Sequence, residues 1–192
     1  MNIPEQMLYK AKRKDWQVFP REKQWVEGFL FPQNYNGTFL WCIGKEPLNA
    51  TLNTTDYGDI YGKYRDWFAI DKETISSFTG MTDTKGNRIY KNDIVEFFGQ
   101  RGVITFECGS FGIAFLDMID WDEIANNIEP VTGCDNRLCA CENDNFISLW
   151  EIAWNFNEIE NNIGVIKVIG NVFDNPELLQ ENKMDIEREE YE

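Results

Sequence analysis

The side chains with the most distinctive chemistry in this sequence are three cysteines in the stretch CDNRLCAC. They are Cys134, Cys139 and Cys141. Thiolates bind zinc, but a structural zinc site holds four sulfur or imidazole ligands, usually in pairs two residues apart. Here four residues and one residue separate the cysteines, and the chain has no histidine. A fourth ligand would have to be Cys42, Cys108 or a carboxylate, so these cysteines are a weak zinc candidate and we expect no metal.

Other side chains give little support for an enzyme. The Cys-x-x-Cys spacing of redox dithiols is missing, and histidine, the commonest general acid or base, does not occur. No nucleophile elbow is found. Carboxylate pairs such as Asp120/Asp122 and Asp56/Asp59 arise by chance in a chain with 33 acidic residues. We therefore assign no catalytic and no cofactor-binding residue, and an enzyme of unknown class is the third of our functional hypotheses.

The charge balance limits the partners that the chain can bind. The 192 residues carry a formal net charge of −15, and a field of this sign repels phosphate backbones and anionic lipid surfaces. No apolar run approaches the ~20 residues that span a bilayer, and the first residues lack an apolar signal core. We expect a cytoplasmic protein without direct nucleic-acid binding and without a membrane.

A run of basic residues near the start of the chain is the local exception to this balance. A charge run is usually a solvated edge of the molecule, which is the interpretation that we favour. The alternative is a docking patch for an acidic partner. The residues are Lys10, Lys12, Arg13, Lys14, Arg21 and Lys23.

The elements that must position these residues are predicted to be mainly β-strands, because short apolar runs alternate with Gly, Pro and Asn. Residues 25–31 and 39–43 form a hairpin whose turn lies within 32–37, where Asn36-Gly37 suits positive φ. Asp66–Ile70 is a further strand, and Asp71 caps a single helical turn. Three strands follow at 93–99, 102–107 and 111–116, with a tight turn at 99–102. They suggest a small meander that can curl into a barrel.

The later part of the chain is less regular. Residues 117–161 look like an inserted loop, with a short amphipathic helix over 117–128 and a polar, cysteine-bearing excursion over 129–145. Within this range FISLWEIAWNF fits either a strand or a buried helix, because a short apolar run does not settle the period. A strand is predicted over 164–173. After it, Asn175 is placed to cap a final helix that has Pro176 in its first turn and continues through Leu178 and Leu179.

The stretch FTGMTDTKGNRIYKNDIVEF, residues 78–97, holds the densest pattern of the chain. Its glycines and aspartates fit turns that lead into a strand, with Gly86 or Asn87 at positive φ. A phosphate-binding P-loop would need Gly-Lys-Ser/Thr before a helix, and a calcium loop would need alternating carboxylates and a closing glutamate. Neither pattern is present. We interpret the stretch as a structural device for entering a strand.

At these residues the sequence resembles the YopX family of phage and prophage proteins, which typically read Phe-Thr-Gly-Leu, Asp-Lys-Asn-Gly, Ile-Tyr and Glu-Gly-Asp-Ile-Val. QWVEGFLF after a basic run resembles the family's opening, and VIGNVFDNPELL resembles its close. Lys91-Asn92 stand where Glu-Gly is usual, and Asn tolerates positive φ well enough to keep that turn. The residues that carry the resemblance, here called the family motif, are Phe78, Thr79, Gly80, Asp83, Gly86, Ile89, Tyr90, Asp93, Ile94, Val95, Gly170, Asn171, Asn175, Pro176, Leu178 and Leu179.

The resemblance implies a β-rich protein with a C-terminal SH3-like small barrel, and it brings no catalytic residues. We expect an N-terminal β subdomain over 1–77 and a barrel domain over 78–176 that contains the inserted loop. A terminal helix and acidic tail follow over 177–192.

Three functional hypotheses remain open. The favoured one is a non-catalytic interaction or assembly module that binds itself and an unidentified host or phage protein, because small barrels with exposed edges and aromatic surfaces pair readily with other chains. The second is a nucleic-acid-associated barrel, in which Trp25, Trp41 and Trp67 could stack on bases, or an acidic mimic of DNA. The third is the enzyme of unknown class.

Overall fold

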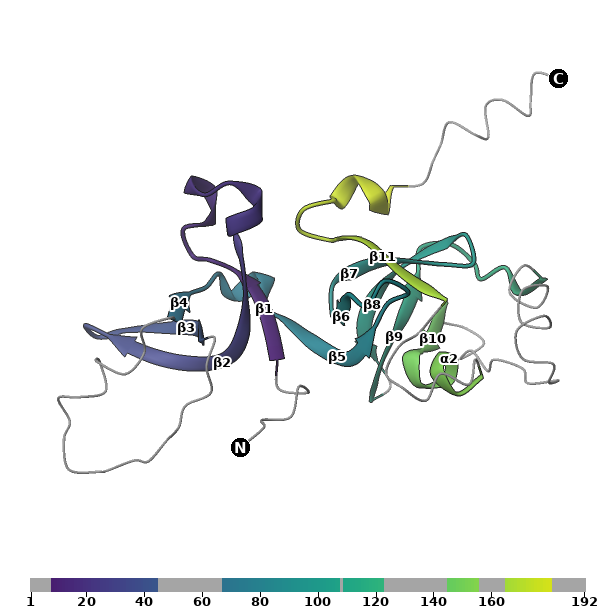
Figure 1. The fold of residues 1–192 in the computed structure, drawn as a ribbon, viewed down its shortest axis with the longest axis horizontal. Coiled ribbons are helices and arrows are strands. Elements are labelled where there is room, and N and C mark those ends of the chain that lie inside the picture. Colours follow the sequence, from purple (N-terminus) through teal and green to yellow (C-terminus); the bar gives the residue numbers. More distant parts are fainter. Residues whose placement is uncertain (1–7, 45–66, 108, 123–144, 156–164, 181–192) are drawn as a thin grey trace, which may run out of the picture. The chain divides into compact units, whose positions relative to one another are not determined.

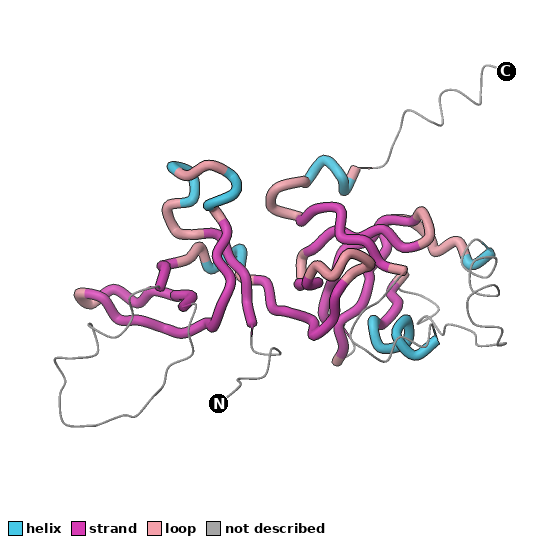
Figure 2. The backbone as a smooth tube through the Cα atoms, in the orientation of Figure 1, coloured by secondary structure: helices cyan, strands magenta, loops and turns pink. Residues whose placement is uncertain are grey.

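The computed structural model describes residues 8–44, 67–107, 109–122, 145–155 and 165–180. The chain divides into two compact units, Met1–Phe78 and Thr79–Glu192; the sequence predicts a boundary after residue 77. Strands make up more than half of the described residues and occur in both units (Figure 1, Figure 2). The prediction of a mainly β fold is therefore confirmed.

The first unit is built on strands in the order β4-β3-β2-β1 of an antiparallel sheet, and β1 also pairs with Ser76 and Ser77. The strands are β1 (Leu8–Lys12), β2 (Trp25–Tyr35), β3 (Thr38–Gly44) and β4 (Trp67–Ala69). One face of this sheet buries a small core of Ala11, Val26, Ile43 and Ile70. The sheet also closes on itself at one end, because Lys14 N donates to Ala69 O and Asp71 N donates to Lys12 O, both at 2.9 Å.

The turn of the β2–β3 hairpin is shorter than predicted. It consists of Asn36 and Gly37, with φ of 49° and 78°, as a two-residue turn between twisted strands requires. Residues 32–35 continue β2 instead of forming the turn. Pro32 is tolerated there because it faces Trp41 across the ladder, three pairs from the pair that closes the hairpin. Hydrogen-bonded and non-hydrogen-bonded pairs alternate, so a backbone N–H at this position does not point at the partner strand.

The second unit holds a curled five-stranded antiparallel sheet in the order β10-β9-β8-β7-β11. The predicted meander is present as β7 (Asp93–Phe97), β8 (Gln100–Glu107) and β9 (Ser110–Phe115), and the predicted strand near the end of the chain is β11 (Ile166–Asn171). The β7–β8 turn consists of Phe98 and Gly99, both at positive φ, so the predicted turn at 99–102 is displaced by one residue and is shorter. Two further strands, β5 (Ser76–Thr82) and β6 (Arg88–Tyr90), precede the meander. The SH3-like assignment stays a prediction.

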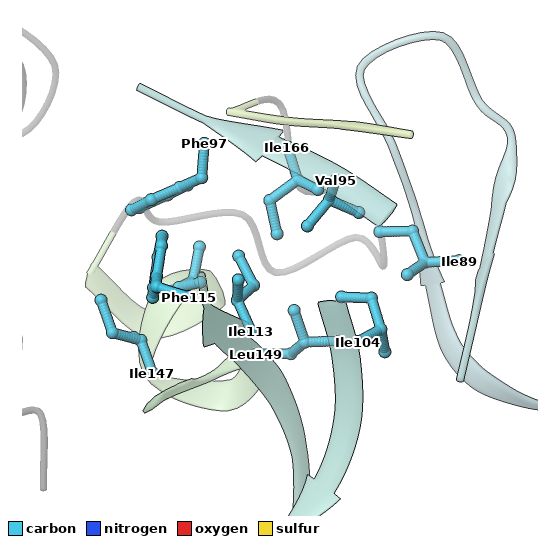
Figure 3. Close-up of a cluster of buried hydrophobic side chains, with 10 residues drawn as sticks. Ile89, Val95, Phe97, Ile104, Ile113, Phe115, Ile147, Leu149 and Ile166 are labelled. Carbon is cyan, nitrogen blue, oxygen red and sulfur yellow. The ribbon is translucent and has the colours of Figure 1, made fainter. Parts of the chain in front are cut away.

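The core of this unit is a cluster of large apolar side chains from every part of it (Figure 3). Alternate residues of the strands point into it, as the two-residue period of a β-strand requires. The fully buried members include Phe97, the largest of them. The cluster consists of Ile89, Val95, Phe97, Ile104, Ile113, Phe115, Ile147, Leu149, Ile152 and Ile166.

The structure corrects part of the predicted insertion over 117–161. Residues 146–148 form the edge strand β10 (Phe146–Ser148), and the helix α2 (Leu149–Asn155) follows without a break. The described part of FISLWEIAWNF, residues 146–155, is thus strand and then helix. Ile147, Leu149 and Ile152 are buried in the core, so this part belongs to the domain and does not loop out of it. The predicted helix over 117–128 is wrong at its start, because residues 117–120 are not helical and only 121–122 are. The rest of it, and the excursion over 129–145 except residue 145, lie outside the described residues.

Short 3-10 helices fill the connections. Two of them, η2 (Trp16–Val18) and η3 (Arg21–Lys23), lie between β1 and β2, and η5 (Lys72–Thr74) follows β4 (Figure 2). The predicted cap of η5 is confirmed, because the Asp71 carboxylate accepts the Glu73 N–H at 3.2 Å. The predicted final helix is the short η6 (Pro176–Leu179), and its N-cap residue Asn175 makes no side-chain capping bond. The predicted acidic tail lies outside the described residues.

Candidate interaction surfaces and the family motif

The basic residues near the start of the chain do not all form a solvated edge. Lys12 is buried, with 3% of its surface exposed, and its Nζ lies 3.9 Å from the centre of the Trp16 ring. The Arg13 guanidinium lies 3.8 Å from the Phe19 ring and 4.9 Å from the Phe68 ring. A cation over an aromatic face is attracted by the ring quadrupole, and more strongly where water is excluded. Two of the six cations therefore act as structural contacts of the first unit.

Three of the other cations are carried by the connection between β1 and β2, and Lys10 lies in β1. Arg13 N donates to Gln24 O at 2.9 Å, which continues the β1–β2 register by one pair beyond Lys12 and Trp25. The Gln24 side chain then donates to Phe19 O at 2.8 Å and fixes the connection from within. Lys14, Arg21 and Lys23 are exposed on it. We call residues 13–24 the basic connection.

A second surface of the first unit is aromatic. Phe39 and Trp41 on β3 are 64% and 37% exposed, and their rings pack edge to face with centroids 6.0 Å apart. Both share a sheet face with Ile43, because strand residues two apart point to the same side. The buried face of the sheet thus continues beyond its core as an exposed aromatic edge. We call Phe39 and Trp41 the aromatic edge.

The second unit contains a hollow of about 260 Å³ beside the β7–β8 turn. The Gln100 side chain supports one wall, because it accepts Asp120 N at 2.9 Å and donates to Asp120 O at 3.3 Å. Arg101, Asp117 and Asp120 all line the hollow, so it carries no dominant charge. No pair of acid and base groups converges in it, and we assign it no chemistry.

The family motif is organised around one buried carboxylate, that of Asp83, which is completely buried. Its Oδ1 accepts the backbone N–H groups of Lys85 and Asn87 at 2.9 and 2.8 Å. Its Oδ2 accepts the Asn87 side chain at 3.0 Å and Val168 N at 3.2 Å. Because Val168 belongs to β11, the carboxylate joins the β5–β6 turn to the other end of the sequence.

The hydrogen bonds also decide the charge state of Asp83. Burial by itself raises the pKa of this carboxyl, but the bonds from Asn87, Lys85 and Val168 outweigh burial and hold the pKa below its usual value. The same turn donates a further backbone bond, from Thr84 N to Ile166 O at 3.0 Å. The turn therefore covers the outer edge of β11, which would otherwise present unpaired backbone groups.

Comparison with protein families matches these features to a known model. The model described as YopX protein matches residues 21–180, well over half of the chain. The chain belongs to the YopX family. The match includes β2, the Asp83 turn and the close of the sequence through η6. A comparison with curated proteins gives no match.

Other residues of the YopX motif make turns and strand ends. Thr79 Oγ1 donates to Ile89 O at 2.8 Å, across the β5–β6 pair. The buried Asp93 carboxylate accepts Tyr90 N at 2.8 Å, and Asn92 between them has φ of 69°. The departure from Glu-Gly at 91–92 thus keeps the turn, as predicted. Ile94 and Val95 are buried in β7.

The last YopX segment closes tightly on itself. Asn171 Oδ1 accepts both Phe173 N and Asp174 N at 3.0 Å. A side chain at Gly170 would begin 2.7 Å from Asn175 Oδ1, so only glycine fits there without movement. Asn175 N donates to Asn171 O at 2.9 Å. Leu178 and Leu179 of η6 are half-buried. Sequence reasoning identified these residues as a motif but did not indicate that Asp83 links its two halves.

The predicted metal candidates Cys134, Cys139 and Cys141 lie outside the described residues, as does Cys108. Cys42 is buried in β3, and burial raises the pKa of its thiol, which disfavours the reactive thiolate. Within the described ranges no cluster of three or more His, Cys, Asp or Glu residues could hold a metal ion. Nor does the described part of the chain contain a helix long and apolar enough to cross a membrane.

Replacing Asp83 by Asn should remove a pH-dependent part of the stability. Because the pKa of Asp83 is lower in the folded than in the unfolded state, its ionised form stabilises the fold at pH values above the ordinary Asp pKa of about 3.9. This stabilisation is lost as the pH falls through the folded-state pKa. We expect Asp83→Asn to lower the free energy of unfolding at pH 7 by about 2–3 kcal/mol, because charged hydrogen bonds are lost. Its stability should then vary less between pH 5 and pH 2 than that of the wild type.

Urea unfolding followed by circular dichroism at several pH values measures both effects. The control is Asp117→Asn, since Asp117 is exposed and should change stability by less than about 0.5 kcal/mol. Equal pH profiles for the wild type and Asp83→Asn would show that Asp83 is not the linked group.

The contact between Lys12 and Trp16 should be measurable as a coupling energy. We expect Trp16→Leu and Lys12→Met each to destabilise the protein, with an interaction of about 1 kcal/mol between them in a double-mutant cycle. Urea unfolding supplies the four free energies. Trp41→Leu, at an exposed ring, is the matched tryptophan control and should show no coupling to Lys12→Met. A vanishing Lys12–Trp16 coupling would contradict the contact.

Proposed function

We propose that this YopX-family protein is a non-catalytic interaction module that assembles through the aromatic edge. The observation that carries the proposal is the exposure of Phe39 and Trp41 as a continuation of the buried face of the first sheet. Single exposed apolar residues are common on monomers, but aromatic rings at the margin of a core face are typical of interfaces. The partner is a second copy of the chain or a host or phage protein in the host cytoplasm.

The geometry of the two rings supports this role. Their edge-to-face contact holds each ring in place before a partner arrives, so less side-chain entropy is lost on binding. Neither ring has a neighbouring charge on the hairpin between residues 28 and 44, where no Lys, Arg, Asp or Glu occurs. A partner that covers the hairpin therefore desolvates no ionised side chain of this segment, which favours a close apolar contact.

The net charge opposes assembly between copies and gives it a distinctive salt dependence. Two chains of charge −15 repel each other, and added salt screens that repulsion. Assembly through an apolar contact should therefore strengthen with salt.

Nucleic-acid association, or mimicry of DNA by the acidic chain, is the alternative function. Stacking of bases on the tryptophans near the basic connection is less favoured. The Lys12 ammonium already lies over the Trp16 ring at 3.9 Å, and the Lys10 ammonium lies over the Trp25 ring at 5.5 Å. One face of each of these two rings therefore already contacts a cation of the protein. An enzyme of unknown class remains the third possibility, with no converging acid and base groups at the hollow beside β7–β8 to support it.

Sedimentation velocity of the full chain over a range of concentrations tests the assembly. We expect a concentration-dependent rise in sedimentation coefficient that Phe39→Ser/Trp41→Ser abolishes or shifts at least thirtyfold in concentration, which corresponds to about 2 kcal/mol at an interface hot spot. Phe106→Ser is the control, because Phe106 is also exposed, at 53%, but lies in the second unit on β8.

Two outcomes would contradict the proposed assembly of the chain with itself through the aromatic edge. One is a wild type that stays monomeric at every concentration and salt level. The other is an assembly that Phe106→Ser disrupts as strongly as the double variant, because the aromatic edge would then not be the contact.

A further inference from the structure

The end of β1 and the basic connection together carry a charge opposite to that of the chain as a whole. Residues 10–23 contain six basic and two acidic side chains, a net charge of +4, while the other residues contain twelve basic and thirty-one acidic side chains. A third of the cations of a strongly acidic chain thus fall within fourteen residues. The Debye length is about 10 Å at 0.1 M salt, so a ligand at this surface mainly experiences the local positive charge.

The structure divides these cations into two groups. Lys12 and Arg13 contact the rings of Trp16 and Phe19 and hold the connection against the sheet. Lys14 and Lys23 are exposed. Lys14 follows Arg13 and Lys23 precedes Gln24, and Arg13 and Gln24 are joined by the 2.9 Å backbone bond. Each lysine is therefore one residue from this bond, and Arg21 is exposed in the segment between them.

An apolar residue accompanies the exposed cations. Val18 of η2 is 77% exposed, in the same short connection. Its backbone N–H donates to Asp15 O at 3.2 Å, and the connection is fixed from within by the Gln24 side chain. The surface thus combines fixed positive charge with an aliphatic contact, which suits a carboxylate-rich protein segment better than a bare phosphate chain.

Nucleic acid is the competing ligand for any basic surface with aromatic rings. Binding of single strands relies on bases that stack on open ring faces. Here Lys12 Nζ lies over Trp16 at 3.9 Å and the Arg13 guanidinium over Phe19 at 3.8 Å, so these faces hold cations of the protein itself. These rings hold Lys12 and Arg13, and the exposed cations Lys14, Arg21 and Lys23 remain as the recognition groups.

We propose that the basic connection is the docking surface for an acidic segment of a partner protein, with Lys14 and Lys23 as its principal recognition residues. The inference deepens the proposed interaction function and rests on it, but it concerns a different surface from the aromatic edge. Its salt dependence has the opposite sign, because salt weakens the attraction between the surface and a carboxylate-rich segment.

The test is fluorescence anisotropy of the full chain with a labelled glutamate dodecamer as the probe. The salt concentration is varied from 0.05 to 0.2 M, over which the Debye length falls from about 14 to about 7 Å. We expect saturable binding that weakens as salt rises and that Lys14→Glu/Lys23→Glu weakens at least tenfold, because two favourable charge interactions become repulsive. Lys72→Glu/Lys85→Glu is the matched control, since both of these lysines are exposed elsewhere and the variant has the same net charge. It should bind the probe within about twofold of the wild type.

A thymidine dodecamer of the same length separates the two ligand classes. Tighter binding of the thymidine dodecamer than of the glutamate dodecamer would overturn the proposal in favour of a nucleic-acid surface. No binding of the glutamate dodecamer, or equal weakening in both lysine variants, would overturn it as well. Lys14→Gln/Lys23→Gln, a milder change, should give an intermediate loss and shows that the effect follows charge.

Sedimentation of the same variants keeps this result separate from the proposed assembly. Lys14→Glu/Lys23→Glu should lose the glutamate probe but assemble like the wild type, whereas Phe39→Ser/Trp41→Ser should keep the probe and lose assembly. If the aromatic edge proves unimportant and the probe still binds through Lys14 and Lys23, only the proposed assembly fails.

Discussion

The fold of the second unit depends on satisfying the Asp83 carboxylate away from water. A buried carboxylate is costly unless donors surround it, and here four N–H groups do so. Three come from its own turn and the fourth from β11. The sheet edge, the turn and the register of β11 are thereby fixed together, and β11 brings Ile166 into the core. The strongest sequence pattern of the chain thus has a structural purpose that joins distant segments.

The first unit uses charge in a different way. Its core is small, and cations over aromatic rings extend the packing beyond it. The same short connection then presents further cations to solvent, while the opposite kind of surface, aromatic and uncharged, lies on the β2–β3 hairpin. The first unit of this YopX-family chain thus carries separate apolar and basic surfaces.

Much of the strand pattern could be predicted from local sequence, because β-branched and aromatic runs between Gly, Asn and Pro are informative over a few residues. The failures have specific causes. The turn at Phe98-Gly99 was misplaced because a bulky residue at positive φ is rare. The strand and helix over 146–155 were assigned to an insertion because their short apolar run has no decisive period, and only packing against β9 establishes the strand.

The sequence by itself determined the family, the mainly β class and the local turn chemistry at Asn36-Gly37, Asp71 and Asn92, since these depend on the conformational limits of neighbouring residues. The tertiary structure alone decided which polar groups are buried. Asp83 and Val168 are 85 residues apart in the chain. The sequence pattern also does not show that the Trp16 ring lies over the Lys12 ammonium group. Burial and hydrogen-bond partners arise from contacts between distant segments, so the fate of a charged residue becomes apparent only when the chain has folded.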